Sequence, residues 1–243
     1  MKMSPNKYFI IILAILFSSC QHDIIYNVFT FSKDTVYVVT PPVVTNPNTG
    51  TTPAVTSDTV CFNTEILPLY VSYCGSAGCH DAATHSSGVM TTDYGHIMVG
   101  IRAKNAANSK YYTIIGNGMP PRNSPQLTAA HIASIKKWID QGALNTNCTK
   151  VCDTTVFTYA GAIQTILSTN CGGCHGAKPG SANIYLGDYA STKAYVSANK
   201  SIFLNAINYV TTIAASKRMP PSGKMVDCKI LQIQKWINNG YPQ

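Results

Sequence analysis

The sequence predicts an all-α protein with two tandem copies of one small helical unit, and three observations lead to this fold class. First, one sparse pattern occurs twice: a Cys-His pair, then Asp-Tyr, Met-Pro-Pro, and Lys-Trp-Ile before a glycine. Second, each copy ends with isoleucines at helical spacing, 98 positions apart in the two copies: Ile132, Ile135, Ile139, Ile230, Ile233 and Ile237. Third, no segment shows a clear strand-like alternation of apolar and polar residues.

The first 20 residues have the features of a secretory signal. Lys2 and Lys7 precede an apolar run from Tyr8 to Phe17, which is too short to span a membrane. The run ends in Phe-Ser-Ser-Cys20, which resembles the lipoprotein box of exported bacterial proteins. That resemblance implies cleavage before Cys20 and acylation of its thiol, so that the protein is membrane-anchored and faces the periplasm or the cell surface. The alternative is an ordinary signal peptide in which Cys20 has no role.

Residues 21–59 are predicted to form a flexible tether, because they are rich in Thr and Pro and poor in charge. Within them only Val36–Val39 has the character of a short strand, and it lacks a partner in sequence. Two domains follow, over residues 60–150 and 151–243. The formal charge of +8 is spread without any Lys/Arg run, which argues against nucleic acid and fits docking to acidic redox protein partners.

Each domain is expected to begin and end with a helix. Asn63–Tyr73 and Tyr159–Ser168 are the expected first helices, and Pro68 is tolerated only in a first turn or at a kink. The closing helices have candidate caps at both ends, with Thr128 and Asp227 as N-caps and glycines as C′ residues, at Gly142 and Gly240.

The second copy contains the attachment signature of a c-type haem, Cys171-Gly-Gly-Cys174-His175. In such a site two thiols add to the two vinyl groups of the haem, and the adjacent histidine binds the iron. The alternatives are a redox dithiol or half of a zinc site. A dithiol needs no following histidine, and a zinc site would have to recruit further ligands from scattered cysteines.

The first copy has the same residues with a wider gap, because four residues separate Cys74 from Cys79 before His80. The repeat supports this irregular site: His80 and His175 are 95 residues apart, and so are the following Asp-Tyr pairs. The sequence therefore predicts two covalently bound haem c groups, one in each domain.

The repeat also selects the sixth iron ligand in each domain. The first domain offers several donors, namely Met90, Met98, Met119, His85, His96 and His131. Only Met119 has a methionine counterpart, Met219, and both precede Pro-Pro, which stiffens the loop. The alternative is a methionine that only fills the core before a turn.

These motifs resemble those of small exported bacterial cytochrome c domains, over about residues 60–243. The resemblance implies a helical shell in which the first and last helices cross, and electron transfer without bond-making chemistry. The four-residue gap of the first site and Pro68 depart from the family pattern.

Four cysteines remain after the haem sites and Cys20. Pairing within the domains gives Cys61–Cys148 and Cys152–Cys228, and a Cys148–Cys152 bridge at the domain junction is the main competitor.

We therefore expect an electron carrier rather than an enzyme, with no small-molecule substrate, because ligation of both irons by methionine leaves no open coordination position. A di-haem peroxidase-like enzyme, with His85 or His96 as an acid-base group, is one alternative. A redox module of a larger surface complex is the other.

Overall fold

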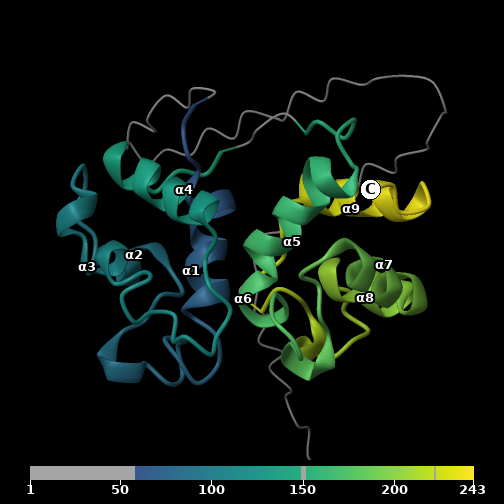
Figure 1. Ribbon diagram of the computed structural model, residues 1–243, viewed down its shortest axis with the longest axis horizontal. Helices are drawn as coiled ribbons and strands as arrows, with labels where there is room; N and C mark the ends of the chain where they lie inside the picture. Colours follow the sequence, from purple (N-terminus) through teal and green to yellow (C-terminus); the bar gives the residue numbers. More distant parts are fainter. Residues whose placement is uncertain (1–57, 149–151, 222) are drawn as a thin grey trace, which may run out of the picture. The chain divides into compact units, whose positions relative to one another are not determined.

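The computed structural model describes residues 58–148 and 152–243 except 222, and Figure 1 shows their arrangement. The described residues belong to one compact unit. The described residues contain helices and no strand, which confirms the all-α prediction. None of these helices is long and apolar enough to cross a membrane. The predicted signal, Cys20, Val36–Val39 and nearly all of the tether lie outside the described residues.

The two halves of this unit contain the following helices. The first half has η1 (Phe62–Ile66), α1 (Leu67–Tyr73), η2 (Ser86–Gly88), α2 (Tyr94–Met98), η3 (Ala106–Asn108), α3 (Lys110–Thr113) and α4 (Ala129–Asp140). The second half has η4 (Tyr159–Ile163), α5 (Gln164–Asn170), α6 (Gly172–His175), η5 (Ser181–Asn183), α7 (Tyr189–Ala198), α8 (Lys200–Ile207), η6 (Ala215–Lys217) and α9 (Asp227–Asn238).

Both halves begin with a π-helical turn that continues into an α-helix. η1 and α1 together cover the expected Asn63–Tyr73 helix, and η4 and α5 cover the second one and extend it to Asn170. Pro68 is the second residue of α1 and follows the helical backbone of η1, and the carbonyl four residues before it, Thr64 O, accepts a hydrogen bond from Lys229 Nζ instead.

The closing helix α4 is capped at both ends as the sequence predicts. Thr128 accepts a hydrogen bond from the backbone N–H of His131, and the His131 ring accepts one from the Thr128 N–H. At the other end Gly142 has a φ of +107°, and its N–H and that of Ala143 bond back to the last turn in a Schellman motif.

The end of α9 repeats this arrangement, but its beginning does not. Gly240, with a φ of +78°, and Tyr241 bond back to the last turn in the same way. The predicted N-cap Asp227 is wrong, because Val226 is the N-cap residue and Asp227 is the first residue of the helix. There its carboxylate contacts Lys224 Nζ at 2.7 Å and faces the positive end of the helix dipole.

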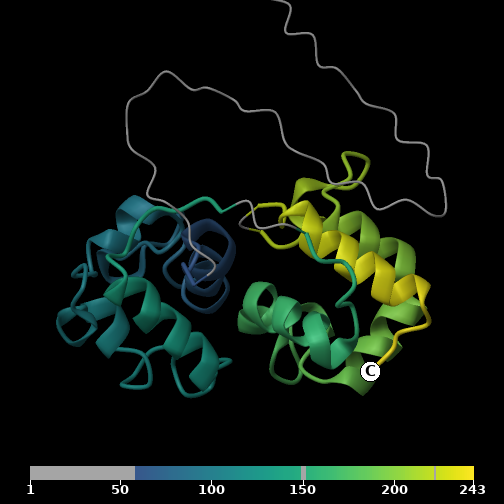
Figure 2. The ribbon, with the colours of Figure 1, turned by 90° about the horizontal axis from the view of Figure 1, so that it is seen from above.

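Each half encloses its own hydrophobic cluster around the tryptophan of its closing helix. Trp138 and Trp236 are 1% and 0% exposed, and each indole N–H donates to a carbonyl six residues later in the chain, Leu144 O and Pro242 O. The π-helical turns η1 and η4 contact α4 and α9 respectively, so the first and last helical segments of each half pack together (Figure 2). Each half of the described residues therefore has its own hydrophobic core.

A disulfide closes each half. The structure pairs Cys61 with Cys148 and Cys152 with Cys228, and the competing Cys148–Cys152 bridge does not form. Four cysteines among the described residues stay unpaired, and these are the ones in the two Cys-His motifs: Cys74, Cys79, Cys171 and Cys174.

His131 connects the beginning of α4 to the second half. Its Nδ1 accepts the hydrogen bond of the capping box, its Nε2 lies 3.3 Å from Ser168 Oγ, and its ring meets Tyr73 edge to face at 5.5 Å. Because burial disfavours the charged form, the pKa of His131 is lowered. Protonation of Nδ1 would remove the acceptor that the Thr128 N–H uses.

This arrangement predicts an acid-labile contact. A histidine whose pKa is lowered in the folded state stabilises fully above its ordinary pKa of about 6.5, and the free energy of unfolding falls as the pH drops below that value. We expect His131→Gln, whose amide can still complete the capping box, to flatten this slope in urea unfolding measured between pH 5 and 8. The exposed His96 provides the control: a His96→Gln variant that flattened the slope equally would contradict the assignment to His131.

Candidate functional site

The first Cys-His motif forms one closed turn at the end of α1. The Cys74 N–H donates to Tyr70 O at 2.9 Å, which completes the helix, and the His80 N–H donates back to Cys74 O at 3.1 Å. Cys79 is held within this turn by a bond from its N–H to Ser76 O at 3.0 Å. The structure therefore brings Cys74, Cys79 and His80 together despite the wider gap.

Asp81 stabilises this wider turn, and it was not predicted from the sequence. One carboxylate oxygen accepts from the Gly78 N–H, and the other accepts from the N–H groups of Ala83 and Thr84, all at 2.8–3.0 Å. These hydrogen bonds hold the pKa of Asp81 at about 2. The available signal for such a turn is an Asp directly after the histidine, followed by small residues.

The second motif folds into the short helix α6. The N–H groups of Cys174 and His175 both donate to Cys171 O, at 3.1 and 2.8 Å. This helical turn holds both thiols and the imidazole on one short stretch of backbone from Cys171 to His175. With only two residues between its cysteines, the second motif fits within a single helical turn.

The two histidines are oriented in the same way. His80 Nδ1 lies 3.1 Å from Ser86 O, and His175 Nδ1 lies 3.0 Å from Ile184 O. A carbonyl can only accept, so Nδ1 carries the proton and Nε2 keeps a free lone pair. An imidazole whose Nδ1–H is held by a carbonyl is the usual form of a metal-binding histidine, with its ring fixed and Nε2 available to a metal ion.

Burial disfavours the thiolate form of three of the four unpaired thiols. Burial raises the pKa of Cys74 and of Cys171 to about 12 each. Burial also raises the pKa of Cys174, and the nearby Cys79 thiol adds to this effect. Reactive dithiols have a lowered pKa instead. Cys74, Cys171 and Cys174 therefore lack the lowered pKa of a reactive dithiol.

Each predicted sixth ligand lies on a separate loop whose backbone is fixed. The Met119 N–H donates to Ile114 O at 3.3 Å, and the Met219 N–H donates to Ala206 O at 3.1 Å. Met119 is 39% exposed, so it is not a core-filling residue in this structure. Its thioether therefore has no packing role that would compete with ligation.

A polar side chain binds the Pro-Pro segment after each methionine, and neither of these residues was predicted from the sequence. Gln126 Nε2 donates to Pro121 O at 2.8 Å, and the Tyr209 hydroxyl donates to Pro220 O. No local sequence pattern predicts either contact, because each depends on the path of the loop in the folded chain.

The three histidines among the other predicted donors of the first half are engaged elsewhere or exposed. His96 Nδ1 contacts the Asp93 carboxylate at 2.6 Å on the surface, and His131 belongs to the capping box of α4. His85 is exposed, with its backbone in the left-handed region at a φ of +45°. The hydrogen bonds of the first two histidines therefore lead to Asp93, Thr128 and Ser168 and not to the Met119 loop.

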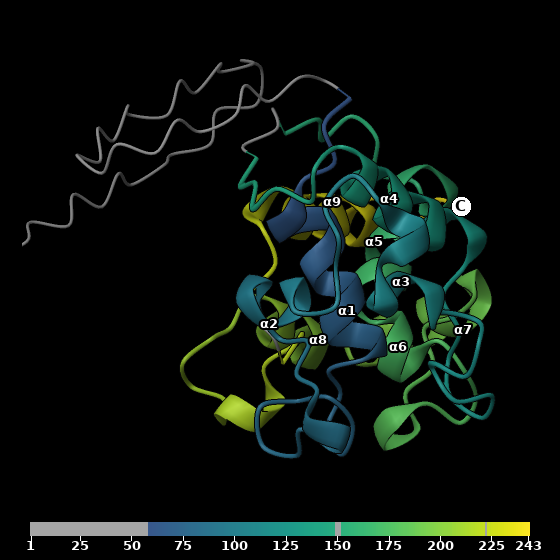
Figure 3. The same cartoon turned by 90° about the vertical axis from the view of Figure 1, so that its left-hand side faces the viewer.

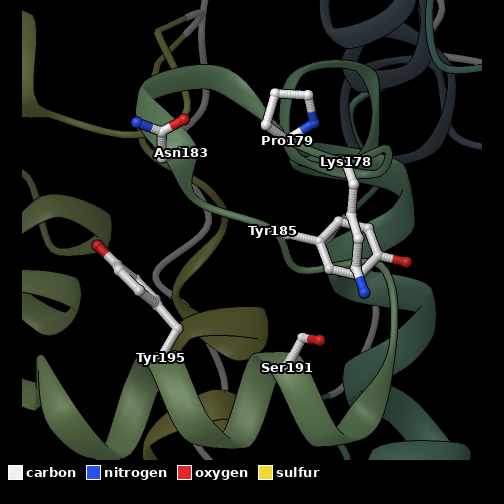
Figure 4. A pocket seen from close by; sticks show the side chains of 6 residues that line it. All are labelled: Lys178, Pro179, Asn183, Tyr185, Ser191 and Tyr195. Carbon is white, nitrogen blue, oxygen red and sulfur yellow. The ribbon is translucent and has the colours of Figure 1, made fainter.

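A pocket of about 490 Å³ opens in the second half between the 178–185 segment and α7 (Figure 4). Its lining consists of Lys178, Pro179, Asn183, Tyr185, Ser191 and Tyr195. Lys178 Nζ lies over the Tyr185 ring, 4.9 Å from its centre. None of the predicted haem ligands lines this pocket, although Tyr185 directly follows the residue whose carbonyl holds His175.

No family model, curated protein or solved structure matches the chain. Within residues 58–148 and 152–243, no three His, Cys, Asp or Glu side chains converge as a metal site. A structural zinc site needs four ligands of this kind, whereas haem iron takes two axial ligands from the protein. The donor sets themselves are therefore the basis for a functional assignment.

Proposed function

We propose that the protein is a di-haem c-type cytochrome that transfers electrons between redox proteins. One observation carries the proposal: two thiols and a histidine with its Nδ1 held by a backbone carbonyl occur together on a single turn, twice in the chain. The repetition favours haem over a chance cluster. The two turns differ in length, yet each has two unpaired cysteines and a histidine whose Nδ1 contacts a backbone carbonyl.

The residues divide into three roles. Cys74, Cys79, Cys171 and Cys174 would bind the two haems through thioether bonds. His80 and His175 would provide one axial nitrogen each, and Met119 and Met219 the opposite sulfur. Bound haem supplies reversible one-electron chemistry at iron, and ligation by His and Met raises its reduction potential. No coordination position remains for a substrate, so the proposed role is that of a carrier and not of an enzyme.

The proposed location follows from the N-terminal sequence. Acylation at Cys20 and a tether over residues 21–59 would hold the haem domains near a membrane and within reach of membrane-associated partners. Cleavage before Cys20 would remove Lys2 and Lys7, so the net charge of +8 would become +6, which would favour contact with acidic partner surfaces.

Counting the haems tests the proposal. When the protein is exported in a host with haem-attachment machinery, its intact mass is expected to exceed that of the cleaved and acylated polypeptide by two haems. Changing Cys171 and Cys174 to Ala is expected to remove one haem, and changing Cys74 and Cys79 to Ala the other. A His96→Gln variant serves as the control and keeps both. A wild-type protein without covalent haem would contradict the proposal.

A further inference from the structure

The two Cys-His turns meet through a direct backbone contact. Ser72 and Tyr73 end α1, immediately before Cys74, and Gly172 and Gly173 lie between Cys171 and Cys174. The Gly173 N–H donates to Ser72 Oγ at 2.9 Å. α1 also packs against α5 and α6 (Figures 1 and 3). The contact therefore joins residues that adjoin the haem-binding cysteines of both halves.

The approach of the two backbones is so close that only glycine fits at position 173. A Cβ atom added at Gly173 would overlap the carbonyl of Ser72, and one added at Gly172 would overlap the Tyr73 hydroxyl. Both approaches would be closer than the 3.0 Å below which real Cβ atoms essentially never come. The glycines of this motif thus have a packing role between the halves in addition to their place in the turn.

Further hydrogen bonds fix the contact. The Tyr73 hydroxyl donates to Ser168 O at 2.9 Å, and Lys229 Nζ donates to Thr64 O at 2.6 Å, so each joins one half to the other. Ser72 and Tyr73 are each 8% exposed, so water is largely excluded from this contact. Such buried, satisfied hydrogen bonds hold two surfaces in one register.

The contact limits the distance between the attachment points. Cys74 lies two residues from Ser72, and Cys174 lies one residue from Gly173. With a chain spacing of about 3.8 Å per residue and the hydrogen bond between Ser72 and Gly173, the Cα atoms of Cys74 and Cys174 are within roughly 18 Å of each other. The rate of electron tunnelling falls steeply with distance, so two haems attached here would exchange electrons more readily with each other than with a distant partner.

We propose, on the basis of the proposed function, that the contact of Ser72 and Tyr73 with Gly172 and Gly173 joins the two haems into one relay. An electron that enters at one haem then passes to the other within the same chain. In this step the ferrous iron of one haem would be oxidised and the ferric iron of the other would be reduced, so one electron would move and no further reactant would be needed.

Electron exchange in the half-reduced protein tests this. In NMR spectra of that sample, the two mixed-valence forms interconvert at a rate that can be measured at several protein concentrations. We expect a wild-type rate that is independent of concentration, and a rate at least about tenfold lower in Gly173→Ala, because the added Cβ must push the two turns apart. Gly95→Ala is the matched control, since its Cβ would meet only Asp93 Oδ1 at 3.5 Å, an ordinary contact.

The outcomes separate the two proposals. A mass showing fewer than two haems in the wild type contradicts the proposed function. Two haems that exchange electrons only in proportion to protein concentration would overturn the relay, and so would a Gly173→Ala rate equal to that of the wild type. If Gly173→Ala loses its haem, the Ser72→Ala/Tyr73→Phe variant replaces it, because it lies outside the attachment motif and removes two of the connecting hydrogen bonds.

Discussion

Replacing Met219 by Ala is expected to remove the near-infrared charge-transfer absorption of one ferric haem while both haems stay attached. The Met219 sulfur is the proposed sixth ligand. Its loss leaves His175 and the proposed covalent bonds between the cysteines and the haem in place. Met119→Ala should do the same at the other haem, and the double variant should have no such band left. The oxidised spectrum and the intact mass of the same samples measure ligation and attachment separately.

Replacing either methionine by His tests the same ligand assignment through the reduction potential of the haem. Imidazole stabilises ferric iron more than a thioether does, so the reduction potential of that haem should fall, by on the order of 0.2 V within the roughly 0.8 V that axial ligands span. A redox titration of each variant shows which of the two haems has the changed reduction potential.

Met90→Ala is the matched control for these variants. Met90 lies in the first half, but the equivalent position of the second copy, 95 residues later, is Tyr185 and not a methionine. It should keep both bands and both potentials. Loss of the band in Met90→Ala, or its persistence in the Met119→Ala/Met219→Ala double variant, would show that the sixth ligands lie elsewhere.

The sequence was sufficient to predict elements whose signals are local. The closing helices have their caps, apolar stripe and terminal glycine within a few residues, and the structure forms a Schellman motif at Gly142 and at Gly240. Asp227 shows the limit of such signals. Asp is favoured both as an N-cap and within the first turn, and the sequence alone does not separate the two positions.

The candidate ligand residues were predictable, but the groups that orient them were not. A Cys-His motif is visible in any sequence, whereas the carbonyls of Ser86 and Ile184 that hold the histidines carry no side-chain signal. The contact between Ser72 and Gly173 joins residues 101 positions apart. Within the attachment motif, Gly173 looks like a turn residue, so its close approach to another helix becomes visible only in the structure.

Removing the disulfide between Cys61 and Cys148 is expected to cause a large loss of stability. The bridge joins residues 87 apart, and the loss of such a long loop constraint lowers the free energy of unfolding by about 4 kcal/mol. Cys152–Cys228, with a separation of 76, constrains the unfolded chain almost equally.

Burial separates the two bridges. Cys61 is 0% and Cys148 8% exposed, whereas Cys152 is exposed and Cys228 partly exposed. Alanines at the first pair therefore leave a cavity in the core, which adds on the order of 1 kcal/mol to the loss, and alanines at the second pair do not. We thus expect both double variants to melt lower than the wild type by roughly 10 °C, and Cys61→Ala/Cys148→Ala to melt lower than Cys152→Ala/Cys228→Ala.

Thermal unfolding of the two double alanine variants, with haem content matched by mass, measures this order. The Cys61→Ala/Cys228→Ala variant is the control for connectivity, because it leaves only Cys148 and Cys152 to pair. It breaks both observed bridges, so it should melt lower than either double variant that removes a single bridge. If it melted like the wild type instead, the short bridge would be the stabilising one and the observed pairing would be wrong.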